Sequence, residues 1–262
     1  MNLKKLYKKH IIISAAASGI GWSIAQSCMK HGATVYITDK NKKELDKISK
    51  NKLYKKQFFL EKVDSSNYKE VQNYFKKLKT KINKIDGLIN NIGVAGPTGR
   101  LENLTVKDWK KTIDININSH FYYTKNSIPF LKKNKKGSII NLSSTAGLFG
   151  FPLRSSYASS KWAVIGMTKT LAMELGEYKI RVNAICPGAV EGDRMKKVIK
   201  AKAKTLGLKE EYLKKDYESM VSLRNFVSKE DISSMAVFLL SDESKNISGQ
   251  NMIVDGNTER MH

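Results

Sequence analysis

The chain has 262 residues, of which 41% are hydrophobic, and this composition excludes an intrinsically disordered protein and favours one α/β domain over two. The net charge of +23 is common among nucleic-acid binders. However, only 6 of the 47 basic residues are arginine and the lysines are spread through nearly every predicted helix, so we expect no specific nucleic-acid site.

Strand-like and helix-like segments alternate along the chain, without an internal repeat or a linker. Short apolar β-rich runs predict strands at residues 10–15, 34–38, 57–63, 87–90, 137–142, 180–186 and 251–254. Helical patterns lie at residues 20–31, 42–49, 68–82, 106–124, 155–176 and 229–239. We therefore expect an α/β fold, a single Rossmann-type doubly wound domain over residues 1–262, with a parallel seven-stranded sheet flanked by helices on both faces.

No apolar run approaches the roughly 20 residues of a membrane-spanning helix, so we expect no membrane association. The basic N-terminus runs directly into the first predicted strand, which argues against a targeting segment. Cys28 and Cys186 fall in a predicted helix and a predicted buried strand, which is typical of a reduced cytoplasmic protein with inert thiols.

Small residues follow the first strand in the stretch Ser-Ala-Ala-Ala-Ser-Gly-Ile-Gly at residues 14–21. Such a turn lets the backbone approach a pyrophosphate, whose charge the N-terminus of the next helix stabilises. A turn of small residues also occurs for packing alone. On the binding interpretation, the cofactor residues of this turn are Ser14, Ser18, Gly19, Ile20 and Gly21.

Asp39 follows the second strand, where a carboxylate can accept hydrogen bonds from the adenosine ribose and repel a 2′-phosphate. This favours NAD as the cofactor. Asp39 could instead cap the helix that starts near Asn41, and Lys40, Lys42 and Lys43 could attract the phosphate of NADP.

Ser144 ends the fifth predicted strand, and Tyr157 and Lys161 lie near the start of a long predicted helix. A spacing of four residues places Tyr157 and Lys161 on one helical face, where the ammonium can lower the phenol pKa and make it a general acid or base. The same pair also occurs by chance on exposed helices. The pair indicates a catalytic site only because it follows Ser144 and the upstream turn in this order.

In this order the motifs resemble those of the short-chain dehydrogenase/reductase family along nearly the whole chain. The family patterns TGxxxGxG, NNAG and YxxxK and its proline-glycine turn match residues 14–21, 90–93, 157–161 and 187–188. The resemblance implies the strand order 3-2-1-4-5-6-7 and a homotetramer. There are departures at Ala15, Ile92 and Gly192, none of which removes a catalytic group.

The resemblance implies a catalytic role for four residues. Tyr157 is expected to donate or accept the proton, Ser144 to hold the substrate oxygen, and Lys161 to bridge Tyr157 and the ribose hydroxyls. Asn116, seven residues after Trp109, is expected to hold a water that relays protons from Lys161.

The resemblance also implies further contacts to NAD. Asp64 corresponds to the adenine contact, and Asn91 is expected beside the adenosine ribose. Pro187 and Gly188 form the turn that precedes Val190, whose backbone is expected to meet the carboxamide. We expect no metal site.

The segment from residue 191 to about residue 225 corresponds to the mobile substrate lid of the family. Sequence strings around this lid resemble a subgroup that acts on small polar alcohols, including hydroxysulfonates. An Arg fork binds such anions in a bidentate manner, so Arg154 and Arg194 are the candidate substrate residues. Arg154 could instead bind a carbonyl or pair across a subunit interface, and Arg194 could pair with Glu191 or Asp193.

These observations favour an NAD-dependent oxidoreductase that transfers a hydride between the nicotinamide and a small polar secondary alcohol or ketone, including anionic hydroxy acids or hydroxysulfonates. One alternative is a reductase of 3-oxoacyl thioesters or other carbonyls that uses NADP. Another is a non-catalytic NAD-sensing scaffold on the same fold, against which the complete catalytic set argues.

Overall fold

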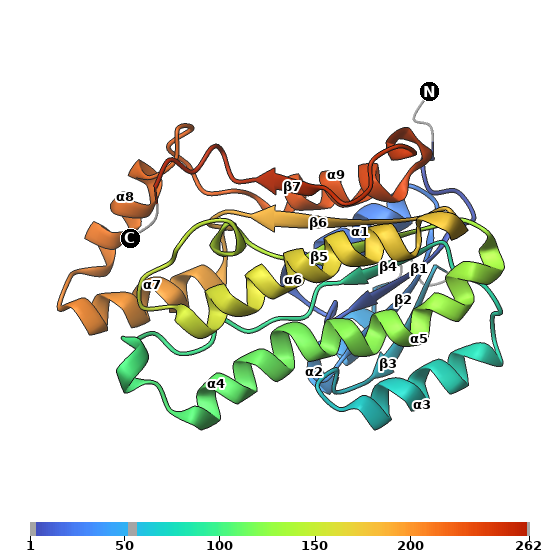
Figure 1. The fold of residues 1–262 in the computed structure, drawn as a ribbon, viewed down its shortest axis with the longest axis horizontal. Coiled ribbons are helices and arrows are strands. Elements are labelled where there is room, and N and C mark those ends of the chain that lie inside the picture. The colour runs from blue at the N-terminus through green and yellow to red at the C-terminus, as the bar shows by residue number, and fades with distance from the viewer. Residues whose placement is uncertain (1–3, 52–56, 261–262) are drawn as a thin grey trace.

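The sheet of the computed structural model, which describes residues 4–51 and 57–260, has seven parallel strands in the order β3-β2-β1-β4-β5-β6-β7 (Figure 1). The strands are β1 (His10–Ser14), β2 (Thr34–Asp39), β3 (Phe58–Lys62), β4 (Gly87–Asn90), β5 (Gly137–Leu142), β6 (Ile180–Pro187) and β7 (Asn251–Val254). The doubly wound fold and the strand order predicted above are thus confirmed. Residues 1–3 at the basic N-terminus lie outside the described residues.

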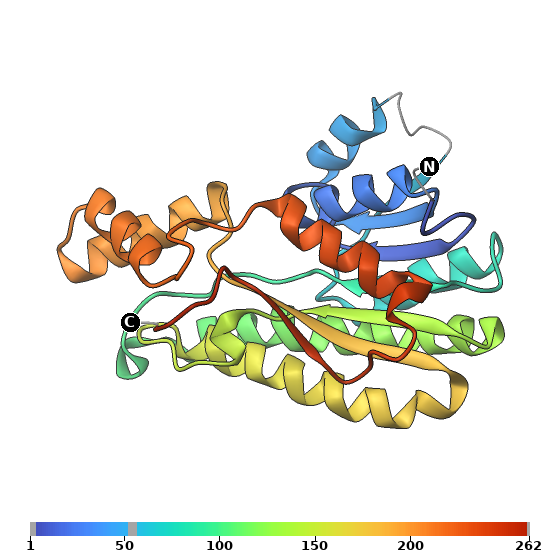
Figure 2. The same ribbon diagram turned by 90° about the horizontal axis from the view of Figure 1, so that it is seen from above.

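Helices cover both faces of the sheet, as Figure 2 shows from above. On one face α1 (Gly19–Lys30), α2 (Lys42–Ser49) and α9 (Lys229–Leu240) pack over a core that includes Ile11 and Ile13. On the other face α3 (Tyr68–Lys79), α5 (Ser119–Asn134) and α6 (Ser155–Glu174) pack over a core that includes Ile12. Because β1 is covered on both faces, its apolar run is continuous and does not alternate.

The segment predicted as one helix at residues 106–124 is interrupted by a π-helical turn and extends further than predicted. It consists of α4 (Val106–Ile113), a π-helical turn at Asp114–Asn118, and α5, which continues ten residues further than expected. Polar residues follow Thr124, and Pro129 lies inside the helix. The helix continues because Phe130 and Leu131 are buried in the core below the sheet, and tertiary packing outweighs local propensity.

The expected lid folds into α7 (Asp193–Leu206) and α8 (Glu210–Ser219), which project beyond the carboxyl ends of β6 and β7 (Figure 1). These helices share a small apolar core of their own, which includes Ile199, Leu213 and Tyr217. The segment begins and ends at one place, because Val190 and Val227 form a β-bridge. Among the described residues, no helix has the length and apolarity to cross a bilayer.

Candidate active site

A cavity of about 550 Å³ lies at the carboxyl ends of the central strands and extends under the lid. Most of the residues singled out in the sequence line it, namely Ser18, Gly19, Ile20, Gly21, Asp39, Asn91, Ser144, Arg154, Tyr157, Lys161, Pro187, Gly188, Val190 and Arg194. Three others, Ser14, Asp64 and Asn116, do not line it. The sheet therefore brings together residues that are up to 176 positions apart in the chain, from Ser18 to Arg194, as expected for the ligand site of a doubly wound fold.

The turn at residues 14–21 forms one wall of this cavity. Ala15 and Gly19 have left-handed backbone conformations, with φ of 50° and 56°. Gly21 is required for packing, because an added Cβ would lie 2.5 Å from the Asn91 Nδ2 and 2.7 Å from the Ala16 Cα. An added Cβ at Gly19 would meet no atom within 4 Å. The side chain of Ser18, the N-cap residue of α1, forms no capping hydrogen bond. The start of α1 can therefore offer free N–H groups to a pyrophosphate.

Ser14 and Asn91 both stabilise the turn at residues 14–21, but only Asn91 also lines the cavity. The Asn91 Nδ2 donates to the carbonyls of Ser14 and Ala15, at 3.2 and 2.7 Å, and the Asn91 N–H donates to the Ser14 hydroxyl at 3.1 Å. Ser14 is fully buried. Ser14 thus supports the cofactor wall from behind, while Asn91 both braces the turn and lines the cavity.

Asp39 lies at the end of β2 and is fixed by two backbone hydrogen bonds. Its carboxylate accepts from the Ala17 N–H at 3.1 Å and from the Asn41 N–H at 2.9 Å. The N-cap of α2 is Asn41, whose side chain accepts from the Glu44 N–H, so Asp39 is not the cap. A carboxylate held at the cavity edge suits a pair of ribose hydroxyls.

The expected adenine contact, Asp64, lies after β3 and outside the cavity lining. Its carboxylate accepts from the N–H and the hydroxyl of Ser66, at 3.0 and 2.7 Å. These hydrogen bonds and the charge of Lys40 outweigh the effect of burial and lower the pKa of Asp64. The contact of Asp64 with a cofactor therefore stays a prediction.

Asn116 lies in the π-helical turn between α4 and α5 and is fully buried. Its side chain accepts from the Val94 N–H at 2.7 Å and donates to the Val94 carbonyl at 3.0 Å and to the Ser160 hydroxyl at 3.0 Å. Single π-turns are frequent at functional sites. Here the turn joins the loop after β4 to α6, the helix that carries Tyr157 and Lys161.

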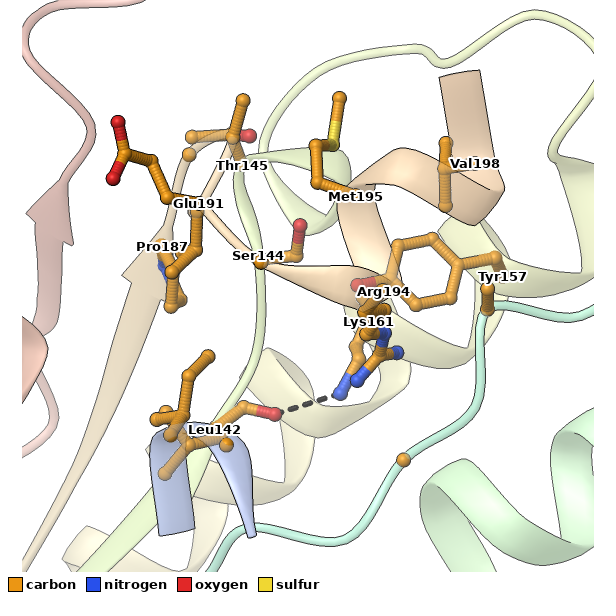
Figure 3. Close-up of a pocket in the computed structure, with 18 of the residues that line it drawn as sticks. Leu142, Ser144, Thr145, Tyr157, Lys161, Pro187, Glu191, Arg194, Met195 and Val198 are labelled. Carbon is orange, nitrogen blue, oxygen red and sulfur yellow. Dashed lines mark hydrogen bonds between the residues drawn. The ribbon is translucent and has the colours of Figure 1, made fainter. Parts of the chain in front are cut away.

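Ser144, Tyr157 and Lys161 gather at one end of the cavity (Figure 3). Burial raises the pKa of Tyr157, but the charges of Lys161 and Arg194 and a hydrogen bond with Ser144 outweigh it, so this pKa lies below its ordinary value. A phenol with a lowered pKa loses its proton more readily than a free tyrosine, which favours a role as a general base.

Lys161 is buried, with 3% of its surface exposed, and its Nζ donates to the Leu142 carbonyl at 2.7 Å (Figure 3). Burial lowers its pKa to about 8, against the opposing effect of Tyr157. The loop after β4 passes close by, since an added Cβ at Gly93 would lie 3.3 Å from this Nζ. The ammonium is thus held between β5 and that loop, next to Tyr157.

The turn at Pro187 and Gly188 closes the cavity on the β6 side. Gly188 is required there, because an added Cβ would lie 2.7 Å from the Cβ of Asp255. The backbone then leads through Val190 into the lid. This course brings Val190 to the cavity lining, while its contact with the nicotinamide stays a prediction.

Arg154, at the start of α6, is 4% exposed. Its Nη2 donates to the Ala95 carbonyl at 2.6 Å, so Arg154 does bind a backbone carbonyl, which was one alternative to a role in substrate binding. Its Cζ also lies 5.1 Å from the ring centroid of Tyr157. Among the described residues no carboxylate lies within 4.0 Å of this guanidinium.

Arg194, in the first turn of α7, is exposed and lines the same cavity. It lies close enough to Tyr157 and Lys161 for its charge to lower the pKa of each. In the described part of the chain it forms no ion pair with Glu191 or Asp193, although both were alternatives.

Several residues of the cavity carried no signal in the sequence. They come from the loop before α6, from the lid and from the C-terminal segment, and include Phe151, Tyr217, Met220, Thr258 and Arg260. Within the lid, the sequence did not indicate which side chains reach the cavity. Over residues 4–51 and 57–260, no three His, Cys, Asp or Glu side chains are grouped to bind a metal.

Comparisons with known proteins agree with this geometry. The model of a family described as enoyl-(acyl carrier protein) reductase matches residues 15–257. The 3-oxoacyl-(acyl-carrier-protein) reductase FabG of Thermotoga maritima is 36% identical over 256 residues, which cover 96% of this chain and 98% of that protein. The trans-4-hydroxycyclohexanecarboxylate dehydrogenase of Sinomonas cyclohexanicum is 34% identical over 259 residues, with 96% and 93% covered.

A solved structure of NAD⁺-bound xylitol dehydrogenase superposes with a TM-score of 0.93 at 25% identity, over 97% of this chain and all of that one. The family match spans nearly the whole chain, and the two relatives are each more than 30% identical. The fold, the position of the cavity and these likenesses together show that the chain belongs to the short-chain dehydrogenase/reductase family of oxidoreductases, which act on alcohol and ketone groups.

Proposed function

We propose that the protein is an NAD-dependent oxidoreductase that transfers a hydride between the nicotinamide and a small polar secondary alcohol or ketone. The observation that carries this proposal is the meeting of Ser144, Tyr157 and Lys161 at one end of a cavity whose other wall is the turn at the start of α1. The open space at Gly19 and the uncapped start of α1 fit a dinucleotide pyrophosphate.

A bound nicotinamide supplies the hydride acceptor or donor, and the proton is handled by the chain. Tyr157 removes the hydroxyl proton in oxidation and returns it in reduction, and its lowered pKa favours the deprotonated form that oxidation needs. Ser144 holds the substrate oxygen, and the ammonium of Lys161 stabilises the phenolate of Tyr157. Asn116 fixes the loop after β4 beside Lys161 through its two hydrogen bonds with Val94.

The preference for NAD rests on Asp39. Its carboxylate is fixed by the Ala17 and Asn41 N–H groups, so it cannot readily turn away from a 2′-phosphate. The solved xylitol dehydrogenase to which the chain is similar is NAD⁺-bound, which supports the same assignment. Asp64, Asn91, Pro187, Gly188 and Val190 keep their proposed cofactor roles.

We further propose that the substrate carries a negative charge, bound by Arg154 and Arg194. The buried guanidinium of Arg154 has no carboxylate partner in the described structure, and an uncompensated buried charge is costly without an anion nearby. The similar dehydrogenase of Sinomonas cyclohexanicum acts on a hydroxycarboxylate, in agreement with this proposal.

The alternative function is reduction of a 3-oxoacyl thioester with NADP. The likeness to the Thermotoga maritima reductase supports it, as does the lysine next to Asp39. The two functions differ in the cofactor and in whether the substrate carries a charged group near the reacting carbon. Assays with both cofactors and both kinds of substrate therefore distinguish them.

We also propose that the protein works in the cytoplasm as a homotetramer. Both cysteines, Cys28 and Cys186, are free and buried, which suits a reducing compartment. The helices α5 and α6 expose large apolar side chains, among them Phe121 and Trp162, each 50% exposed, which suits burial against further subunits. Size-exclusion chromatography with light scattering measures the oligomeric state.

The test of the main proposal is a panel of polar secondary alcohols, assayed with NAD and NADP by the absorbance of the reduced cofactor. We expect oxidation with NAD, and at least an approximately 100-fold loss of turnover in Tyr157→Phe with cofactor binding retained. Near wild-type turnover in Tyr157→Phe would remove the proposed mechanism. Activity only with NADP and 3-oxoacyl thioesters would establish the alternative.

A further inference from the structure

Two side chains of the cavity have buried polar atoms without a hydrogen-bond partner among the described residues. They are the Nε–H of Arg154 and the hydroxyl of Tyr217. Arg154 is 4% exposed and Tyr217 is 6% exposed. The other described side chains with such an atom, for example Tyr74 and His120, do not line this cavity. Buried donors are nearly always satisfied in folded proteins, so two in one ligand cavity indicate a polar ligand group.

The charges around this pair favour an anion as that group. Within residues 4–51 and 57–260 the Arg154 guanidinium makes one hydrogen bond, to the Ala95 carbonyl, and the charge of Arg194 also reaches it. Behind the ring of Tyr217 lies the buried Lys202, whose Nζ is 5.1 Å from the ring centroid. Asp216 is the acidic group that interacts with both Lys202 and Tyr217. Arg154, Arg194 and Lys202 together outnumber the one acidic group Asp216 among these interacting residues, so an anion bound by the two donors is stabilised.

Tyr217 can act only as a hydrogen-bond donor toward such an anion. Burial raises its pKa, while Arg154 opposes this and Asp216 adds to it, so the hydroxyl stays protonated at neutral pH. The side chain belongs to α8 and packs in the apolar core of the lid with Leu213 and Met220. Its position therefore depends on the lid, whereas Arg154 belongs to the floor of the site at the start of α6.

Arg154 lies beside the residue proposed to transfer the proton. The guanidinium carbon lies 5.1 Å from the ring centroid of Tyr157, the residue that exchanges the proton with the reacting oxygen. A molecule that reaches both groups has its anionic group close to its reacting carbon.

We propose that Tyr217 and Arg154 together bind the carboxylate or sulfonate of a short hydroxy or keto acid. This inference rests on the proposed function and adds a specificity-determining residue from the lid. The bound anion would join α8 to the start of α6, so that the lid closes over anionic substrates in preference to neutral ones.

The test compares three substrates that share a secondary alcohol: 3-hydroxybutanoate, 2-hydroxypropane-1-sulfonate and the neutral 1,3-butanediol. The variants are Tyr217→Phe, which keeps the ring, and Arg154→Met. The matched control is Tyr212→Phe, since Tyr212 is on the same helix but 61% exposed.

In Tyr217→Phe we expect kcat/KM for the preferred anion to fall about 10-fold to 100-fold, as for a lost hydrogen bond to a charged group, and the diol to change by less than about 3-fold. Arg154→Met should reduce kcat/KM for the anions more than for the diol, which it also affects because the charge of Arg154 lowers the pKa of Tyr157, while Tyr212→Phe behaves as wild type. If Arg154→Met does not fold, Arg154→Lys keeps the charge and Tyr217→Phe still decides the question. The anion that wild type oxidises better distinguishes a carboxylate from a sulfonate.

Equal losses for the anions and the diol in Tyr217→Phe would overturn the inference while leaving the oxidoreductase function in place. If no substrate is oxidised with NAD or NADP, the proposed function fails, and binding then decides the anion site. For this purpose butanoate is added to the cofactor-saturated protein, with sodium chloride at equal ionic strength as the reference. A rise in Tm in wild type that is lost in Tyr217→Phe supports the site, and no rise or an equal rise in both contradicts it.

Discussion

Ala15 has a left-handed backbone conformation, with φ of 50°, in the turn that starts the candidate cofactor site. This conformation costs a residue with a Cβ roughly 1–2 kcal/mol. Glycine removes this cost but adds about 0.4–1 kcal/mol of conformational entropy to the unfolded chain. Because Ala15 lines the cavity, its methyl group contributes little to the core. We therefore expect Ala15→Gly to stabilise the protein by about 0.5–1 kcal/mol.

A gain of this size corresponds to an increase in Tm of about 1–4 °C for a chain of this length. Differential scanning calorimetry at a fixed protein concentration measures it. The matched control is Ala17→Gly, because Ala17 is 2% exposed and has no left-handed backbone. That variant loses a buried methyl group and gains the same entropy in the unfolded chain, so we expect a loss of about 1–2 kcal/mol. If Ala15→Gly is as destabilising as Ala17→Gly, the left-handed strain at Ala15 is refuted.

Three further predictions follow from the site. Alcohol oxidation should rise and ketone reduction fall with increasing pH, with a midpoint below the ordinary tyrosine pKa of about 10, because the charge of Lys161 lowers the pKa of Tyr157; a midpoint at or above 10 in the pH profile of kcat/KM would contradict this. Asp39→Ala should lower the ratio of kcat/KM with NAD to kcat/KM with NADP, or invert the preference. A wild type that already prefers NADP would show that the NAD assignment is wrong. Gly21→Ala should lower the free energy of unfolding by about 1–3 kcal/mol and weaken NAD binding measured by fluorescence titration, since its Cβ meets the Asn91 side chain and backbone atoms; unchanged stability and affinity would argue against this packing.

Much of the fold could be predicted from local sequence. The apolar run at residues 10–15 and the later runs are typical of strands buried on both faces, and β4, β5 and β7 have the predicted bounds. The pair Tyr157 and Lys161 was also predictable, since four residues along a helix place two side chains on one face. The strand order, in contrast, came from resemblance to the family, because alternation alone leaves several orders open.

The less regular features depended on contacts between distant segments. The helix predicted to end at residue 124 continues because Phe130 and Leu131 reach the core, and the π-turn around Asn116 is held by the Val94 backbone. Ser14 accepts a hydrogen bond from the Asn91 N–H, and its expected contact with the cofactor stays a prediction. No local pattern contains this information, since each feature depends on a partner far along the chain.

The sequence by itself therefore determined the doubly wound fold class, the order of the motifs and the proposed chemistry of Tyr157, because these depend on periodicity and on short spacings along the chain. Only the tertiary structure decided which side chains meet in the cavity. It buried Arg154 without a carboxylate partner among the described residues and placed the lid residue Tyr217 in the same cavity. The physical reason is that burial and charge compensation depend on the packing of segments that the sequence separates, and not on the residues that neighbour them in the chain.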